Sequence, residues 1–446
     1  MAVEEAKSHC VVLIPSPFTG HITPMLQLAY VLHAKGFSIV INHSELNPPD
    51  TSNHPEFTFF PLKDGLSNRD PSFSNLFNII PEMNTNCRGP FRQYLVEMME
   101  EKTELYGKIS CIVYDHLMYF VNEVADHLKL PSILLRPSSC AYMEAVCAFF
   151  QLRAENHFPL PESQLLDPVP KVPVLRFKDL PFALTSEIPE HVLKLLEKVA
   201  DLGSSVAIIW NTMGDLENRA LSWLQQYYQV PIFTIGPLHK MASSSLTSLA
   251  EEDANCISWL DTQAPNSVLY VSLGSIVVMD ENELIETAWG LFNSNRPFLW
   301  VVRSSNDLPD GYLEAVGDRG RIVKWAPQKE VLAHPAIGGF WSHCGWNSTL
   351  ESILEGVPMI CRPCFGDQNV NARYLTHVWK VGLELGTDDL TRGVVERAIR
   401  KLMVEEEGEE LRLRIHDMKQ KLQMSFRDGG SSRNSLKSLT EFMSSL

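Results

Sequence analysis

Short apolar runs alternate with longer segments of helical periodicity along the first half of the chain. The runs are rich in β-branched residues and apolar on both faces, which is typical of parallel strands covered by helices on each side. We expect such strands at residues 11–15, 37–42, 57–62, 111–115, 132–136, 206–211 and 231–236. The pattern predicts an α/β domain on a doubly wound parallel sheet.

A polar, Ser-rich stretch separates this series from a second one. Residues 237–256 have no hydrophobic period and are interpreted as a linker between domains at 1–236 and 257–425. In the second domain, strands are expected at 267–275, 297–303, 321–325, 337–343, 357–363 and 381–385. Two doubly wound halves predict a cleft, with ligands bound off the carboxyl ends of the strands.

Composition and charge narrow the class of protein. A chain of 446 residues has room for two or three domains, and its net charge of −16 argues against nucleic acid or an anionic membrane as partner. The N-terminus has no secretory pattern, and no apolar run approaches the ~18 residues of a membrane span. Nine scattered cysteines fit reduced thiols, so a cytoplasmic protein is expected. Cys361 and Cys364 have redox-pair spacing but are interpreted as inert thiols.

A phosphate site is predicted where a helix begins after residues 342–346. Ser348 and Glu351 have the spacing of a capping box, and the positive end of a helix attracts anions. Gly345 lets the backbone approach a ligand, while His343 and Asn347 can donate hydrogen bonds. Capping alone would explain Ser348 and Glu351, but the residues just upstream favour phosphate binding.

Two further groups stand near expected strand ends. Trp325 ends a strand, where it can stack on a flat base or fill the core, and its position alone does not decide between them. Asp367 and Gln368 can bridge two sugar hydroxyls, or Asp367 can make an ordinary turn.

A general-base pair is predicted in the first domain. His21 is expected in the loop between the first strand and a helix that Thr23 caps and Pro24 opens. Asp115 ends another strand of the same parallel sheet, so both side chains lie at one edge. A His held by an Asp can accept a proton from a hydroxyl. Each residue taken alone has an ordinary structural explanation.

The sequence also lacks several motifs. It has no GxGxxG fingerprint and no GxxxxGK[ST] loop, which argues against dehydrogenases and ATPases. It has no DxD triplet to hold a metal on a diphosphate, so no metal is expected.

Residues 325–368, WAPQKEVLAHPAIGGFWSHCGWNSTLESILEGVPMICRPCFGDQ, closely resemble the signature box of plant family-1 UDP-glycosyltransferases. The segment PSPFTGHITPMLQLAYVL at 15–32, Asp115 and SLGS at 272–275 match this family as well. The resemblance implies a GT-B fold of two Rossmann-like domains facing across a cleft. The first would bind the acceptor and the second the UDP-sugar, with a C-terminal helix at 426–446 returning to the first domain.

The family's site residues carry over position by position. Those that would contact the uridine are Trp325 on uracil, the Ala326 backbone, and Gln328 and Glu351 on the ribose. Those that would surround the diphosphate are Ser275, His343, Gly345, Asn347 and Ser348. Those that would contact the sugar are Trp346, Asp367 and Gln368, and the final Gln favours UDP-glucose. His21 would be the general base and Asp115 its partner.

The implied activity is an inverting glucosyl transfer to a small lipophilic plant metabolite through a hydroxyl, carboxyl or amine, giving a β-glucoside. It needs UDP-glucose as donor substrate, no permanently bound cofactor and no metal, and a monomer is expected. The alternatives are a UDP-sugar hydrolase, a non-catalytic UDP-sugar-binding protein or, least favoured, an interaction protein that uses its C-terminal helix.

Some features depart from the family or specify it further. His116, directly after Asp115, is unexpected for the family and could compete for the carboxylate. HITP at 21–24 and IVYDHLMYF at 112–120 resemble the subgroup acting on diterpenoids and cytokinins. Candidate residues for the acceptor pocket, for which a core role is equally open, are Met118, Ser139, Met143 and Phe149.

Overall fold

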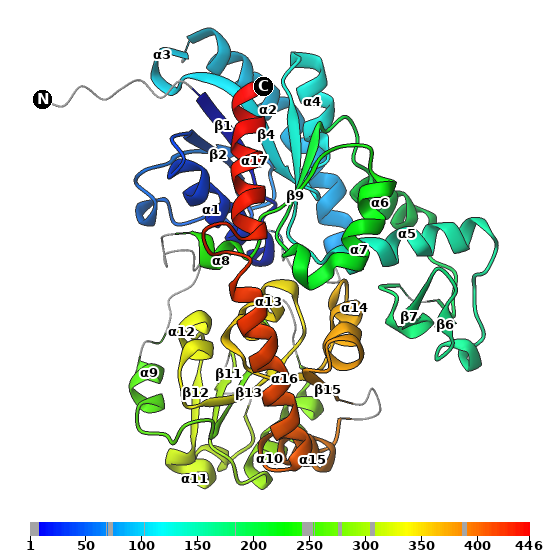
Figure 1. The fold of residues 1–446 in the computed structure, drawn as a ribbon, viewed down its shortest axis with the longest axis vertical. Coiled ribbons are helices and arrows are strands. Elements are labelled where there is room, and N and C mark those ends of the chain that lie inside the picture. Colours follow the sequence, from blue (N-terminus) through cyan, green and yellow to red (C-terminus); the bar gives the residue numbers. More distant parts are fainter. Residues whose placement is uncertain are drawn as a thin grey trace, which may run out of the picture. The chain divides into compact units, whose positions relative to one another are not determined.

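The structure is a computed structural model of the 446-residue chain. It describes residues 9–67, 69, 75–101, 103–182, 184–242, 253, 255–274, 279–303, 308–385 and 390–446. The chain forms two compact units (Figure 1). Unit 1 comprises Met1–Phe158, Ser186–Leu249 and Met424–Leu446, and unit 2 comprises Pro159–Thr185 and Ala250–Gln423.

Unit 1 is built on a seven-stranded parallel sheet with the order β3-β2-β1-β4-β5-β8-β9. The strands are β1 (His9–Ile14), β2 (Ser38–Ser44), β3 (Thr58–Leu62), β4 (Lys108–Asp115), β5 (Ser132–Arg136), β8 (Ala207–Trp210) and β9 (Ile232–Thr234). All seven predicted strands are present. The order reverses between β1 and β4, and open sheets of this kind bind ligands at such a switch point.

Helices cover this sheet. They are α1 (Thr19–His33), α2 (Leu76–Glu101), α3 (Thr103–Tyr106), α4 (Phe120–Leu128), α5 (Cys140–Ala154), α6 (Glu190–Ala200), α7 (Gly214–Tyr227), α8 (Leu238–Met241) and α17 (Ser431–Ser445), with a 3-10 turn at Thr51–Asn53. Among the described residues, no helix is both long and apolar enough to cross a membrane.

The last helix of the chain is part of the core of unit 1. Figure 1 shows α17, in red, beside the sheet of this unit. Leu436, Leu439 and Met443 are buried in the same cluster as residues of β1 and α1, and Phe442 packs against Phe233 of β9. The spacing of the three buried residues gives α17 one apolar stripe.

Replacing Leu439 with alanine is therefore expected to lower the free energy of unfolding by about 2–5 kcal/mol, because the cavity lies in a closed core. Urea unfolding followed by circular dichroism measures this change. Lys437→Ala on the exposed side of α17 is the control, and it should stay within about 0.5 kcal/mol of the wild type. Equal stability of both variants would contradict a core role for α17.

Unit 2 has a six-stranded parallel sheet with the order β12-β11-β10-β13-β14-β15. Its strands are β10 (Val268–Ser272), β11 (Phe298–Val301), β12 (Gly320–Val323), β13 (Ile337–Ser342), β14 (Met359–Cys361) and β15 (Gly382–Glu384). All six were predicted, with longer boundaries. Here the order reverses between β10 and β13, which gives unit 2 its own switch point.

The helices of unit 2 are α9 (Asn255–Leu260), α10 (Glu281–Asn293), α11 (Tyr312–Val316), α12 (Gln328–Ala333), α13 (Trp346–Glu355), α14 (Gln368–Arg373), α15 (Arg392–Met403) and α16 (Glu406–Gln423). Single turns lie at Gly317–Arg319 and Tyr374–Val378. Its core includes Trp300, Trp341 and Ile360 from the middle of the sheet.

Residues 159–185, which we call the strap, pack with unit 2 although they lie within the range 1–236 expected for the first domain. The strap holds 3-10 turns at Glu162–Gln164 and Phe177–Asp179 and an antiparallel hairpin of β6 (Pro168–Val169) and β7 (Val172–Arg176). The Arg373 Nε atom donates to the Val174 carbonyl at 2.9 Å, and Lys178 forms an ion pair with Glu384 at 3.0 Å. These contacts join the strap to the end of α14 and to β15.

Candidate active site

The predicted pair of a general base and its carboxylate partner is formed at the switch point of unit 1. His21 lies in the first turn of α1, directly after β1, and Asp115 is the last residue of the adjacent strand β4. The His21 Nδ1 atom is 2.7 Å from Asp115 Oδ2. The His21 side chain is 23% exposed and that of Asp115 is fully buried, so only the imidazole can reach a substrate.

The environment of Asp115 keeps its carboxylate ionised. Burial would raise its pKa, but His21, His116, the hydrogen bond from His21 and that from the Leu117 amide together lower the pKa below its ordinary value. The Leu117 amide donates to Asp115 Oδ1 at 2.9 Å. A fixed negative charge therefore faces the Nδ1 side of His21.

The start of α1 differs from the sequence prediction. The helix begins at Thr19, and the amides of His21 and Ile22 both donate to the Phe18 carbonyl at 2.8 and 2.9 Å. The prediction that Thr23 caps this helix, with His21 in the preceding loop, is therefore wrong. Pro24 lies inside the helix, which continues past the one N–H that proline lacks. His21 is consequently held by helical backbone.

His116 does not take the carboxylate from His21. Its Nδ1 atom is 3.7 Å from Asp115 Oδ1, beyond hydrogen-bonding distance, and its ring centroid is 5.3 Å from that of His21. Burial, with Arg136 and His21 adding to it, lowers the pKa of His116 to about 3 despite the opposing effect of Asp115. His116 is therefore a neutral imidazole at physiological pH.

A second group of predicted residues meets at the switch point of unit 2. His343 follows β13, and the chain after β10 turns at Gly274, whose φ is +76°. A Cβ atom on Gly274 would lie 2.8 Å from the His343 ring, and one on Gly345 only 2.5 Å from it. The imidazole thus fills the space that both glycines leave. Burial lowers the pKa of His343 to about 4, so this ring is also neutral.

The helix start next to His343 can face an anion. Gly345 is the N-cap of α13 without a side-chain cap, and the first helical hydrogen bond runs from the Thr349 amide to the Gly345 carbonyl at 2.9 Å. The amides of residues 346–348 precede this bond, at the positive end of the helix. Such a helix start suits a phosphate.

The predicted capping box at Ser348 and Glu351 is wrong. Ser348 is already the third helical residue, and both side chains bind Gln328 of α12 instead. Gln328 Nε2 donates to Ser348 Oγ at 3.0 Å and to Glu351 Oε2 at 2.7 Å. The Tyr270 hydroxyl donates to Gln328 Oε1 at 3.3 Å. The two predicted ribose contacts, Gln328 and Glu351, are therefore neighbours.

The start of α14 brings Asp367 and Gln368 to the same sheet edge. Gln368 is 3% exposed, and its Oε1 atom accepts from the amides of Cys364 and Phe365 at 2.8 and 3.1 Å. Its Nε2 group therefore remains as the donor. Asn371, which sequence analysis missed, donates to Asp367 Oδ2 at 2.9 Å and to the Cys344 carbonyl at 3.0 Å.

Fewer contacts define the positions of the remaining residues predicted for the donor site. Trp325 is partly buried two residues after β12, and its carbonyl accepts from the Asp253 amide at 3.0 Å. Ala326 is buried beside it. Trp346 is 3% exposed, and its ring centroid lies 6.4 Å from that of Trp379. Ser275 lies outside the described residues.

The candidates for the acceptor pocket are all buried, at Met118, Ser139, Met143 and Phe149. Met118 lies beside His21 and Asp115: its amide donates to the Asp115 carbonyl at 2.8 Å. Ser139 caps α5, which carries the other two candidates, through the Tyr142 amide at 3.2 Å.

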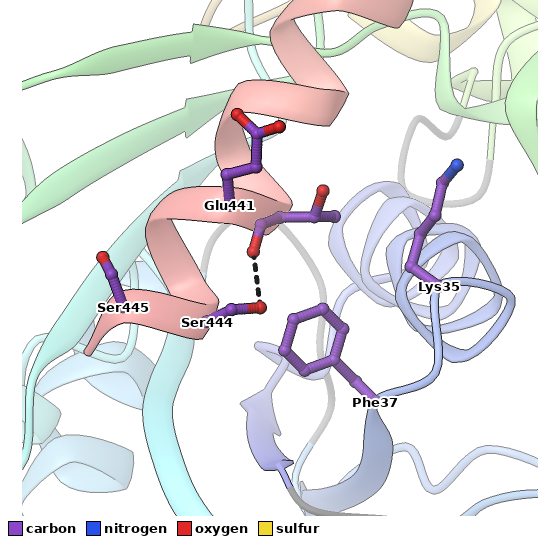
Figure 2. Close-up of a pocket in the computed structure, with 6 residues that line it drawn as sticks. Lys35, Phe37, Glu441, Ser444 and Ser445 are labelled. Carbon is purple, nitrogen blue, oxygen red and sulfur yellow. Dashed lines mark hydrogen bonds between the residues drawn. The ribbon is translucent and has the colours of Figure 1, made fainter.

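An open hollow of about 430 Å³ lies elsewhere, next to α17 (Figure 2). It is lined by residues of α17 and of the turn between α1 and β2, namely Lys35, Phe37, Thr440, Glu441, Ser444 and Ser445. None of these residues belongs to either switch point, so we place the candidate site by its chemistry rather than by this hollow.

Comparison with known proteins decides the family. The model of the family described as UDP-glucoronosyl and UDP-glucosyl transferase matches residues 78–421. The chain belongs to this family. UDP-glycosyltransferase 76E1 of Solanum lycopersicum is 54% identical over 456 residues, covering 100% of this chain and 94% of the relative. Flavonol 3-O-glucosyltransferase UGT76E12 of Arabidopsis thaliana is 44% identical over 460 residues, covering 99% and 98%.

Solved structures agree with this assignment. UGT2 of Phytolacca americana, complexed with UDP-2fluoro-glucose and pterostilbene, is 27% identical and superposes with a TM-score of 0.84 over 98% of this chain and 99% of that one. The glycosyltransferase therefore has the GT-B fold, and the two sheets are its Rossmann-like halves. As a plant family-1 UDP-glycosyltransferase, it transfers a sugar from a UDP-sugar to a small molecule.

Acid is expected to destabilise this glycosyltransferase through two buried histidines. Unfolded, His116 and His343 take up protons near pH 6.5; folded, they do so only near pH 3 and pH 4. Their contribution is complete above pH 6.5 and is lost as the pH falls, by up to about 1.4 kcal/mol per pH unit for each histidine. Melting temperatures between pH 7 and 4.5 measure the slope.

His116→Asn should flatten this pH dependence, because it removes one of the two groups. His157→Asn is the control, since His157 is exposed and pairs with Glu155 at 3.4 Å. If the three proteins lose stability equally over this pH range, the buried histidines are not responsible.

Proposed function

We propose that this glycosyltransferase moves glucose from UDP-glucose to a hydroxyl, carboxyl or amine of a small lipophilic plant metabolite and forms a β-glucoside. The observation that carries the proposal is the 2.7 Å bond between His21 and buried Asp115 at the switch point of unit 1. In a transferase of this family, such a pair is suited to remove the acceptor's proton.

The chemistry follows from the tautomer of His21. Asp115 accepts the Nδ1–H proton, which leaves the Nε2 lone pair of the neutral imidazole available. Nε2 takes the acceptor's hydroxyl proton as the acceptor oxygen bonds to the anomeric carbon and the bond to UDP breaks. Asp115 stabilises the imidazolium that results. One displacement from the face opposite UDP inverts the anomeric configuration.

The donor is proposed to bind at the switch point of unit 2. The start of α13, with Ser275, His343, Gly345, Asn347 and Ser348, would stabilise the diphosphate charge as UDP departs. Gln328 and Glu351 would hold the ribose, while Trp325 and the Ala326 backbone would hold the uracil. The sugar hydroxyls would meet Asp367, the Nε2 group of Gln368 and Trp346. We expect no metal to take part.

The acceptor is proposed to bind near Met118 and α5 of unit 1. Two relatives support a lipophilic ring compound: one is named a flavonol 3-O-glucosyltransferase, and the other was solved with pterostilbene. We further propose that the protein works as a cytoplasmic monomer, with 1–236 binding the acceptor, 257–425 the donor and 237–256 as the linker. None of the nine cysteines forms a disulfide in the structure, which is consistent with the proposed reducing compartment.

The test incubates the protein with UDP-glucose and a panel of flavonoids, phenolic acids, diterpenoids and cytokinins. Mass spectrometry reads the added hexose, and NMR coupling at the anomeric carbon reads the configuration. A new β-glucoside is expected. An α-linked product would contradict the single displacement, and transfer from another UDP-sugar but not UDP-glucose would contradict the donor. UDP release without any glucoside would favour the hydrolase.

A further inference from the structure

One buried histidine has no task in the reaction described above. His116 is 7% exposed, and its Nδ1 atom has no hydrogen-bond partner among the described residues. This nitrogen faces Asp115 Oδ1 across 3.7 Å. A buried polar atom without a partner costs free energy, so the arrangement suits something that can bind both atoms at once.

The three side chains around this gap form a set of metal ligands. His21, Asp115 and His116 each offer one ligand atom, and these atoms all lie within 4.8 Å of one another. Two imidazoles and a carboxylate make up a common open zinc site, in which water takes the fourth position. Ligand atoms ~2.0–2.1 Å from a tetrahedral Zn²⁺ are about 3.3 Å apart. The His21 Nδ1 atom is 2.7 Å from Asp115 Oδ2, and the His116 Nδ1 atom is 3.7 Å from Oδ1 of the same carboxylate, so the two distances lie on either side of that value.

We propose that His21, Asp115 and His116 form an inhibitory site for Zn²⁺ and related transition-metal ions. The site needs no new element of the fold, only a movement of three side chains whose ligand atoms already lie within 4.8 Å of one another. It exists because this chain has a histidine directly after Asp115.

Inhibition follows from the tautomer that the metal imposes on His21. When Zn²⁺ bonds to Nδ1, the proton on Nδ1 is lost to solvent and another binds Nε2, so no net proton is released. The Nε2 lone pair that would accept the acceptor's proton is then gone. Metal binding itself does not depend on the proposed function, whereas the loss of activity rests on His21 being the base.

Local charges set the strength and selectivity of the site. Asp115 is the only negative ligand, and buried Arg136 lies near enough to lower the pKa of His116, which opposes a cation. We therefore expect reversible inhibition rather than a permanently bound ion. Cu²⁺ should inhibit most strongly, followed by Zn²⁺ and Ni²⁺, then Co²⁺ and Mn²⁺. Mg²⁺ and Ca²⁺ prefer oxygen ligands and should have no effect.

The first test compares wild type, His116→Asn, His116→Gln and the surface control His157→Asn. Each rate of transfer with zinc sulfate is divided by the same protein's rate in EDTA, so differences in basal activity cancel. Loss of one of three ligands should raise the inhibition constant for Zn²⁺ by about 10-fold or more in both His116 variants. The control should match wild type. Equal inhibition of all four proteins, as zinc binding to UDP-glucose would give, overturns the proposal.

The second test observes binding without any turnover. Tetrahedral Co²⁺ gives a visible absorption band, expected in wild type and His157→Asn and missing from both His116 variants and from His21→Ala. The same band in the His116 variants overturns the site. A band that requires all three residues, together with an unchanged rate of transfer, would support the site and count instead against His21 as the base.

Discussion

Replacing His21 with alanine is expected to lower kcat for sugar transfer by about 10³-fold, the typical contribution of a positioned general base. The KM for UDP-glucose should change little, because no residue of the proposed donor site lies in unit 1. The side chain to be removed is the exposed member of the 2.7 Å pair with Asp115. Steady-state kinetics with one acceptor from the panel gives both constants.

Two further variants sharpen this test. Asp115→Asn keeps the shape of the pair but no longer accepts the Nδ1–H proton as a carboxylate, so kcat should fall by about 10²-fold or more. His9→Ala is the control, because His9 begins β1 in the same sheet and its side chain bonds to the Ser110 hydroxyl at 2.9 Å rather than to Asp115. Transfer that survives in both His21→Ala and Asp115→Asn would show that the base is another group.

Replacing Glu351 with alanine is expected to raise the KM for UDP-glucose by roughly 10- to 100-fold, because hydrogen bonds to a charged group contribute about 1.5–3 kcal/mol. Glu351 would hold the ribose and also accepts from Gln328 Nε2 at 2.7 Å. Its removal therefore takes away one proposed contact to the ribose and also loosens the orientation of Gln328, the other residue proposed to hold the ribose. Titration with UDP, followed by calorimetry, should show the same loss without any acceptor.

The neighbouring carboxylate on the same helix gives the control. Glu355 is one turn further along α13, and its carboxylate pairs with Lys419 at 3.5 Å. Glu355→Ala should leave the KM for UDP-glucose unchanged, and Glu351→Gln should restore part of the affinity. Equal affinities for UDP in the Glu351→Ala and Glu355→Ala proteins would remove Glu351 from the donor site.

The sequence was sufficient to predict the strands of both sheets and the sheet edge at which the candidate site lies. Buried parallel strands have a strong hydrophobic signal, so all thirteen expected strands are present. The carboxyl ends of parallel strands share one edge of a sheet, so the pairing of His21 with Asp115 could be predicted before any distance between them was known. The β6–β7 hairpin was missed, because its strands are short and contain prolines and a charged residue instead of a continuous apolar run.

Predictions that depended on local motifs failed where distant residues decide the outcome. Ser348 and Glu351 have the spacing of a cap, but Gln328, twenty residues before Ser348, binds both of them. Asn371 looks like an ordinary helix residue in the sequence, and its bonds to Asp367 and to the Cys344 carbonyl become visible in the fold. Such partners come from packing between elements, which the spacing of residues along one element does not encode.

The way in which the chain alternates between its units sets a rule for building hybrids with related enzymes. A single crossover near residue 250 would join a strap from one parent to the α14 and β15 of another, and would give unit 1 a foreign α17. A hybrid that keeps residues 159–185 with 250–423, and 424–446 with the N-terminal part, preserves every contact described within each unit. Exchange of the proposed acceptor-binding unit between relatives should therefore need four junctions in the chain, whereas a single crossover has one.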